Sequence, residues 1–180
     1  MAENMKVFLR FAEGCRCYLD DVGVLKPRDN KAIKSGKPDR ETLKRVFYMA
    51  YPEMEKEAKR LKKPLLNQEV LRQYYCFRHN RMKHDDGHYA CMVFPGYVIG
   101  RLNNEYVIEL EPIEGAFRLS SKLNLKHGDW VLVHRLNIVE KVPAKFALEV
   151  ADYLKKLGMG KHLKFPAETM KYLKRLKQRK

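Results

Sequence analysis

The stretch from Cys91 to Val142 constrains the fold of this 180-residue chain most strongly, because its apolar residues follow the two-residue period of β-strands. From Tyr106 to Leu110, successive residues are assigned to opposite faces of one strand. The stretch is interrupted at short intervals by the turn-forming residues Asn103-Asn104, Glu114-Gly115 and His127-Gly128-Asp129. It therefore predicts four or five short antiparallel strands. Curling protects the edges of so small a sheet, so we expect a partly open barrel of the OB kind.

Two short motifs stand out in this stretch: Cys91-Met92-Val93-Phe94-Pro95-Gly96-Tyr97-Val98 and Gly128-Asp129-Trp130-Val131-Leu132-Val133-His134. Together and in this order, they resemble the hydrogenase assembly chaperone family of the HypC/HupF type, over about residues 91–157. The resemblance implies an OB-like barrel and a non-enzymatic function in which a cysteine and a histidine handle an iron fragment. Those roles would fall on Cys91 and His134. The implied partners are an iron-scaffold maturation protein and the precursor of the hydrogenase large subunit.

The chain also departs from the pattern of that family. Cys91 follows ninety residues instead of one, and Arg135-Leu136-Asn137 stands where the family usually has a glycine shortly after the histidine. A thiolate and a neutral imidazole both suit transition metals, which favours a metal site at Cys91 and His134. The alternative interpretation is an ordinary buried cysteine and a polar histidine at a strand end.

The residues on either side of the barrel predict helices. Asn4, Asp39 and Asn67 are suitable N-caps, and apolar residues at three- and four-residue spacing follow each of them. Residues 20–38 are rich in Gly, Pro, Ser and Asp, which predicts a loop. We therefore expect an α+β protein. Its predicted parts are a mostly helical region over 1–88, the OB-like barrel over 89–143, and C-terminal helices with a basic tail over 144–180.

The formal net charge of +15 is concentrated at the C-terminal end. Residues 155–180 contain ten Lys or Arg and one acid, which leaves +9. Such a concentration is typical of a tail that binds nucleic acid or an acidic protein, or else of a solvated helix that keeps a protein soluble. The candidate nucleic-acid-binding residues of the tail are Lys161, Lys164, Lys171, Lys174, Arg175, Lys177, Arg179 and Lys180.

An OB-like nucleic-acid-binding protein is therefore the second hypothesis for the function. Barrels of this kind bind single strands through aromatic platforms and basic grooves. The barrel residues that could supply both are Tyr97, Tyr106, Phe117 and Trp130 with Arg101, Arg118 and Arg135. In the alternative interpretation the aromatic residues form the barrel core and a belt on its surface.

Four Cys and His residues occur as two close pairs, Cys15-x-Cys17 and Cys76-x-x-His79. Four such donors can hold a tetrahedral zinc ion, so the pairs predict a candidate structural metal site. Otherwise Cys15 and Cys76 are core residues.

Common signatures of catalysis are missing from the sequence, which contains no phosphate-binding Gly-x-x-x-x-Gly-Lys-Ser/Thr loop, no Gly-x-Ser-x-Gly and no His-Glu-x-x-His. We therefore expect a protein that is not an enzyme. No run approaches the roughly 20 apolar residues of a membrane-spanning helix, and the N-terminus lacks the apolar block of a signal peptide. These features predict a cytoplasmic protein.

Overall fold

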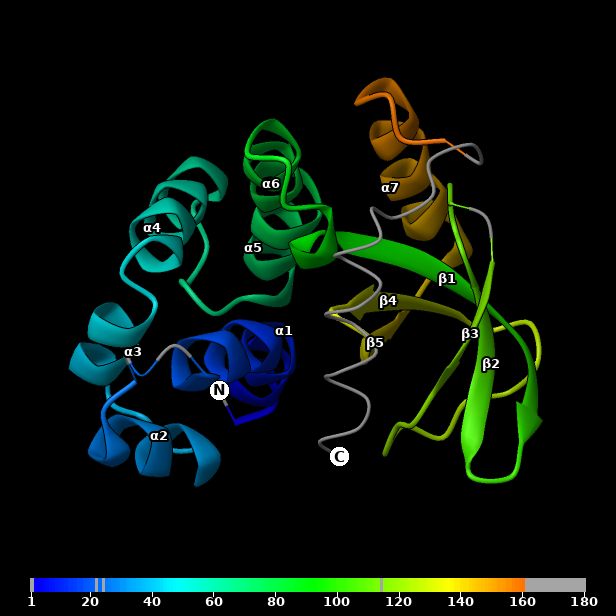
Figure 1. Ribbon diagram of the computed structural model, residues 1–180. Coiled ribbons are helices and arrows are strands. Elements are labelled where there is room, and N and C mark those ends of the chain that lie inside the picture. The colour runs from blue at the N-terminus through cyan, green and yellow to red at the C-terminus, as the bar shows by residue number, and fades with distance from the viewer. Residues whose placement is uncertain (1, 22, 24, 114, 161–180) are drawn as a thin grey trace. The chain divides into compact units, whose positions relative to one another are not determined.

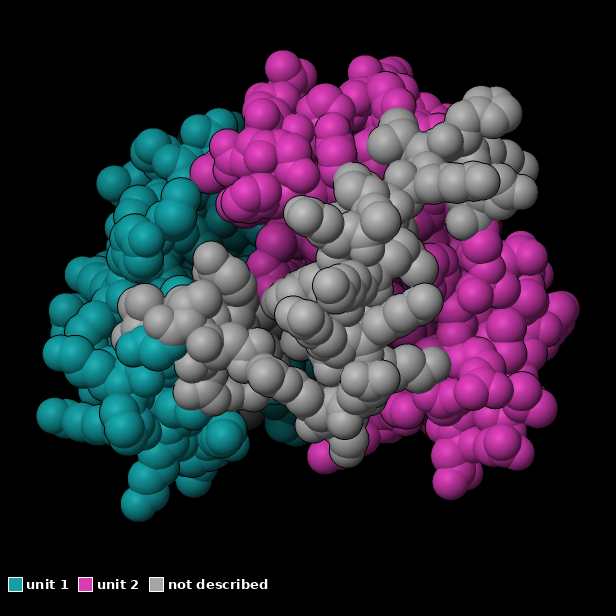
Figure 2. Space-filling view, viewed as in Figure 1, with its two compact units in different colours: residues 1–79 teal, residues 80–180 magenta. Residues whose placement is uncertain are grey.

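The computed structural model describes residues 2–21, 23, 25–113 and 115–160 (Figure 1). The chain divides into two compact units, one up to His79 and one from Asn80 onward (Figure 2). The first unit is helical, and the second contains an antiparallel sheet with helices, so the predicted α+β class is confirmed. The predicted boundaries at 1–88, 89–143 and 144–180 stay predictions. Among the described helices, none is both long and apolar enough to cross a membrane.

Short helices build the first unit. They are α1 (Ala2–Asp21), α2 (Pro27–Lys34), α3 (Arg40–Val46), α4 (Ala50–Leu61), α5 (Gln68–Gln73) and a π-helical turn (Tyr74–His79). Two predicted N-caps are confirmed. The Asp39 side chain accepts a hydrogen bond from the Thr42 amide at 2.6 Å, and the Asn67 side chain accepts one from the Glu69 amide at 2.9 Å. Each cap satisfies a backbone donor that has no partner within its own helix.

The predicted loop over residues 20–38 is wrong in its centre, where the chain forms α2. Pro27 occupies the start of this helix, a position where the missing amide proton costs nothing and the fixed φ of proline suits a helix. Burial of Ile33 and Asp29 then stabilises one face. Glycine, proline and serine residues at both ends of this short helix gave residues 20–38 the composition that is typical of a loop.

Aromatic side chains form the core of the first unit. The rings of Phe11 and Tyr75 stack with their centroids 4.4 Å apart, and Phe8 meets Phe47 edge-on at 5.3 Å. All four side chains are buried. Because each large aromatic side chain removes a large apolar surface from water, these contacts join α1 to segments distant in the sequence.

A partly buried ion pair joins α2 to α3. Asp29 accepts two hydrogen bonds from Arg45, from Nε at 3.0 Å and from Nη2 at 2.6 Å. The Asp29 side chain is 5% exposed, whereas the Arg45 side chain is 47% exposed. The hydrogen bonds from Arg45 hold the pKa of the Asp29 carboxyl below its ordinary value of 3.8.

We expect the free energy of unfolding to depend on pH through Asp29. Because its pKa is lowered by folding, the carboxylate stabilises the fold above about pH 4 and loses that contribution as pH falls through the lowered pKa. Asp29→Asn should therefore cost about 1–3 kcal/mol at pH 7 and progressively less as the pH falls below about 4. Urea unfolding across this pH range measures the difference.

Glu41→Gln is the matched control, because Glu41 pairs with Lys44 at 3.5 Å on the surface. An exposed pair of this kind contributes less than about 1 kcal/mol. An Asp29→Asn protein as stable as the parent at pH 7 would show that the ion pair does not hold α2 to α3.

The second unit is organised by an open antiparallel sheet in the order β3-β2-β1-β4-β5. Its elements are α6 (Asn80–Asp85), a 3₁₀ turn (Tyr89–Cys91), β1 (Val93–Leu102), β2 (Glu105–Leu110), β3 (Ala116–Leu119), β4 (Trp130–His134), β5 (Asn137–Val142) and α7 (Ala144–Lys156). Strand β1 lies between β2 and β4, and α7 packs against β1 and β4 (Figure 1). The strand prediction is thus confirmed.

The sheet does not close into a barrel: within the described residues, pairing ends at β3 and at β5. The segment after β3 is held by a side chain instead of by a strand partner. Tyr106 donates from its hydroxyl to the Leu123 carbonyl at 3.0 Å and accepts from the Leu125 amide at 3.2 Å. The Tyr106 side chain therefore holds this segment without extending the ladder of strand pairs.

Candidate functional site

Strand pairing brings the two sequence motifs together at one end of the sheet. In the β1–β4 pair, Val93 lies opposite His134 and Tyr97 lies opposite Trp130. Cys91 ends the 3₁₀ turn two residues before Val93, so it lies beside the end of β4. The start of one motif and the end of the other thus meet in space.

The side chain of His134 is fully buried and fixed by the backbone of the first motif. Its Nε2 atom lies 2.9 Å from the carbonyl oxygen of Cys91. Because a carbonyl only accepts, Nε2 donates this bond and carries the proton. In the neutral ring, Nδ1 is then the nitrogen with a lone pair that a metal could use.

Arg135 faces the sulfur atom of Cys91. Its Nη2 atom donates a hydrogen bond to the Cys91 Sγ atom. Both residues are only 9% exposed, so the guanidinium and the sulfur meet largely out of water. A guanidinium is always protonated, which makes it a suitable partner for an anionic sulfur.

The turn that presents Arg135 has an unusual backbone. His134 pairs with Asn137, which leaves Arg135 and Leu136 as a two-residue hairpin loop with φ angles of 48° and 61°. Such turns favour Asn-Gly, because side chains with a Cβ atom clash at positive φ. This chain therefore keeps an arginine beside Cys91 at a position where the backbone alone would favour another residue.

We expect Leu136→Gly to leave the free energy of unfolding unchanged or to raise it by up to about 1 kcal/mol, because glycine removes the clash at positive φ. Leu148→Gly is the matched control, since Leu148 is 49% exposed and lies within α7. Glycine in a helix interior should lower stability by about 1 kcal/mol. Equal losses in the two variants, measured by urea unfolding, would show that the turn is not strained.

Asn80 holds the strand that follows Cys91. Its side chain donates to the Val93 carbonyl and accepts from the Val93 amide, both at 2.7 Å, and it is fully buried. Sequence reasoning missed this residue, because a single asparagine in a helical segment has no periodic signal. The sequence contains one signal for Arg135, because a charged residue occupies a turn position that favours Asn-Gly.

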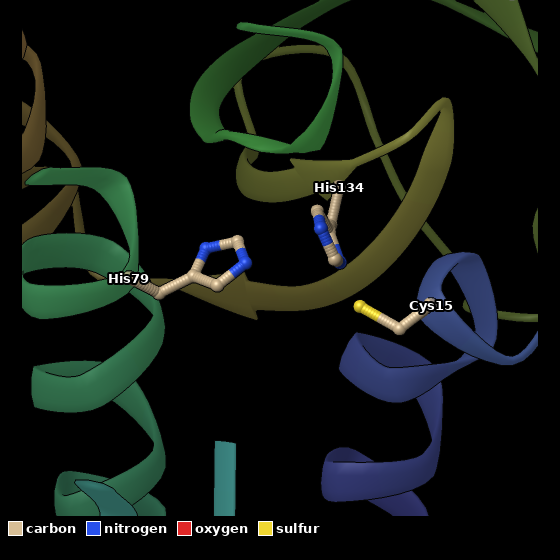
Figure 3. Close-up of side chains that lie close together, drawn as sticks. All are labelled: Cys15, His79 and His134. Carbon is tan, nitrogen blue, oxygen red and sulfur yellow. The ribbon is translucent and has the colours of Figure 1, made fainter. Parts of the chain in front are cut away.

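The second predicted metal site lies in the first unit. The ligand atoms of Cys15, on α1, and His79, at the end of the π-helical turn, lie within 4.8 Å of each other, and Figure 3 shows the sulfur directed toward the ring. These two side chains form a candidate metal-binding pair. Figure 3 also labels His134, which belongs to the second unit.

The other two predicted donors of this site do not join the pair among the described side chains. Cys76 is fully buried but does not belong to the donor group of Cys15 and His79. Cys76 and His79 both lie in the π-helical turn, whose wider i to i+5 bonding moves positions three apart away from a common face. The Cys17 side chain lies outside the described residues.

Zinc in the first unit remains a prediction, and removal of the metal would test it. A structural zinc ion takes four donors, and its binding free energy becomes folding free energy. We expect chelation to lower the melting temperature by roughly 5 °C or more. Cys15→Ser should lose the zinc, whereas Cys91→Ser should retain it, as elemental analysis would measure. Protein purified without zinc, with a melting temperature that chelation does not change, would contradict the prediction.

The predicted aromatic platform is divided between the two faces of the sheet. Tyr97 lies opposite Trp130, and their rings meet edge-on at 5.2 Å. The strand registers place Tyr106 and Phe117 on the other face, because successive residues of a strand alternate. Tyr106 is also buried.

The three arginines that were predicted to line a basic groove likewise contact different groups. Arg101 lies over the Tyr106 ring, 5.4 Å from its centroid, and Arg118 forms an ion pair with Glu105 at 3.3 Å. Arg135 is buried beside Cys91. The eight predicted cations of the tail, from Lys161 to Lys180, lie outside the described residues.

Comparisons of the chain with protein-family models, with curated proteins and with solved structures found no match.

Proposed function

We propose that the protein is a non-enzymatic assembly factor that handles iron through Cys91 and works by protein contacts, as the hydrogenase assembly chaperones do. One observation supports this proposal above the others. Where the two motifs converge, the Arg135 guanidinium donates to the Cys91 sulfur and the His134 ring donates to the Cys91 backbone carbonyl. The open sheet would then be a variant of the OB-like barrel in which the edge strands remain apart.

The residues around Cys91 suit the reversible binding of a metal as cargo. The Cys91 thiolate would be a soft ligand for iron, and Nδ1 of His134 would be the nitrogen donor. Arg135 would hold the sulfur by its hydrogen bond when no iron is bound and would release it when iron binds. Two protein donors leave other coordination positions of the iron for a partner protein, as a transfer factor requires.

The internal position of Cys91 is compatible with this role. The hydrogen bonds of Asn80 to Val93 hold the start of β1 in place, so the sulfur is positioned although many residues precede it. A site whose ligands are fixed by surrounding hydrogen bonds binds its cargo with less loss of freedom.

The proposed partners follow from the family resemblance. They are an iron-scaffold maturation protein, from which the iron fragment would come, and the precursor of a hydrogenase large subunit, which would receive it. We place this exchange in the cytoplasm.

Cys91→Ser tests the proposal. Serine keeps the approximate size of cysteine but replaces a soft thiolate by a hard hydroxyl, so we expect ferrous iron to bind about 10- to 100-fold more weakly. The measurement is anaerobic titration of the purified full chain with ferrous iron, together with co-purification of the two proposed partners. An unchanged melting temperature would show that the variant is folded.

Cys76→Ser is the matched control, because it removes a buried thiol from the other unit that belongs to no metal-donor group among the described side chains. It should bind iron and partners as the parent protein does. If Cys91→Ser also does so, the proposed function is wrong. If Cys15→Ser alone loses iron, the site lies in the first unit and Cys91 is a structural residue.

A further inference from the structure

Five exposed cations lie along α2 and its ends, and we call them the basic row: Lys26, Arg28, Lys31, Lys34 and Lys37. None of them forms a salt bridge with another residue in the described part of the chain. The basic row belongs entirely to the first unit and shares no residue with the Cys91 site. The function of the basic row is therefore independent of the Cys91 site.

Among the described side chains, no nearby acid forms an ion pair with the basic row. The one acid between Lys26 and Lys37 is Asp29, which is buried and bound to Arg45 by two hydrogen bonds. Asp39, which follows the row, caps α3 with its side chain. The outward surface of α2 is therefore uniformly cationic.

The basic row has mixed effects on the stability of its own helix. Lys31 and Lys34 lie in the last turn, where the helix dipole favours a cation. Arg28, Lys31 and Lys34 are also spaced three apart, so neighbouring like charges repel each other on one helix face. A surface on which exposed cations repel one another fits a partner that supplies negative charge.

We propose that the basic row binds the phosphate backbone of nucleic acid without reading its sequence. Arg28 and Lys34 are separated by about 9 Å along the helix, from a rise of about 1.5 Å per residue, so the row can contact successive phosphates. Large apolar residues of the segment, Leu25 and Ile33, are buried. The surface thus has neither a group for insertion into lipid nor an aromatic platform for bases, and it matches a regular array of phosphates.

This surface differs from the one that the sequence alone predicted, which used the C-terminal tail and the aromatic residues of the sheet. The inference holds whether or not Cys91 handles iron, because the two sites lie in different units.

A charge-matched pair of variants tests the inference in the full chain. The row variant carries Arg28→Gln, Lys31→Gln, Lys34→Gln and Lys37→Gln. The control variant carries Lys59→Gln, Lys122→Gln, Lys145→Gln and Lys156→Gln, four exposed cations outside the row. Each set lowers the formal net charge from +15 by four, to +11. Any difference between them therefore reports position and not total charge.

The probes are fluorescent 20-nucleotide DNA of mixed sequence, single-stranded and duplex, titrated at several salt concentrations. Each lost phosphate contact reduces the slope of log affinity against log salt by about 0.7 to 0.9, so the row variant should flatten the slope by roughly 3. The control variant should keep the slope of the parent, and changing the DNA sequence should not change affinity. Melting temperatures confirm that both variants are folded.

Three outcomes would overturn the inference. In the first outcome, the row variant binds DNA with the slope of the parent. In the second, both variants lose affinity equally, which would indicate a response to total charge alone. In the third outcome, the row variant loses binding to phosphatidylserine vesicles or to polyglutamate but not to DNA, which would assign the row to a membrane or to an acidic protein.

Discussion

Both halves of the sheet depend on β1, because this strand pairs with β2 along one edge and with β4 along the other. The Ile108 side chain of β2 packs over Gly96 of β1, so a Cβ atom at Gly96 would lie 2.5 Å from Cγ2 of Ile108. A side chain there would force the buried Ile108 side chain to move. The glycine of the first motif is therefore required by packing, and Cys91 lies two residues before the start of the same strand.

The surroundings of Cys91 are polar although they are buried. His134 donates to a backbone carbonyl, Asn80 bonds both backbone groups of Val93, and Arg135 donates to the sulfur. A network of buried hydrogen bonds holds its members in one arrangement. The positions of the sulfur, the imidazole and the guanidinium are thus determined together.

The two proposed activities use different physical chemistry in different units. The Cys91 site relies on a soft donor that is removed from water, where electrostatic interactions are strong and geometry decides what binds. The basic row relies on exposed cations whose interactions are screened by salt and do not require a fixed geometry. Because neither site uses residues of the other, loss of one activity does not imply loss of the other.

Local signals in the sequence determined the five strands and the caps at Asp39 and Asn67, because alternation and capping act between residues close in the chain. The composition around residues 27–34 predicted a loop, but burial against other helices stabilises a helix there. Only the tertiary structure decided that the sheet stays open and that Arg135 faces Cys91. The reason is physical: which residues meet across strands depends on register, bulges and turn conformation, and these are set by packing between distant segments.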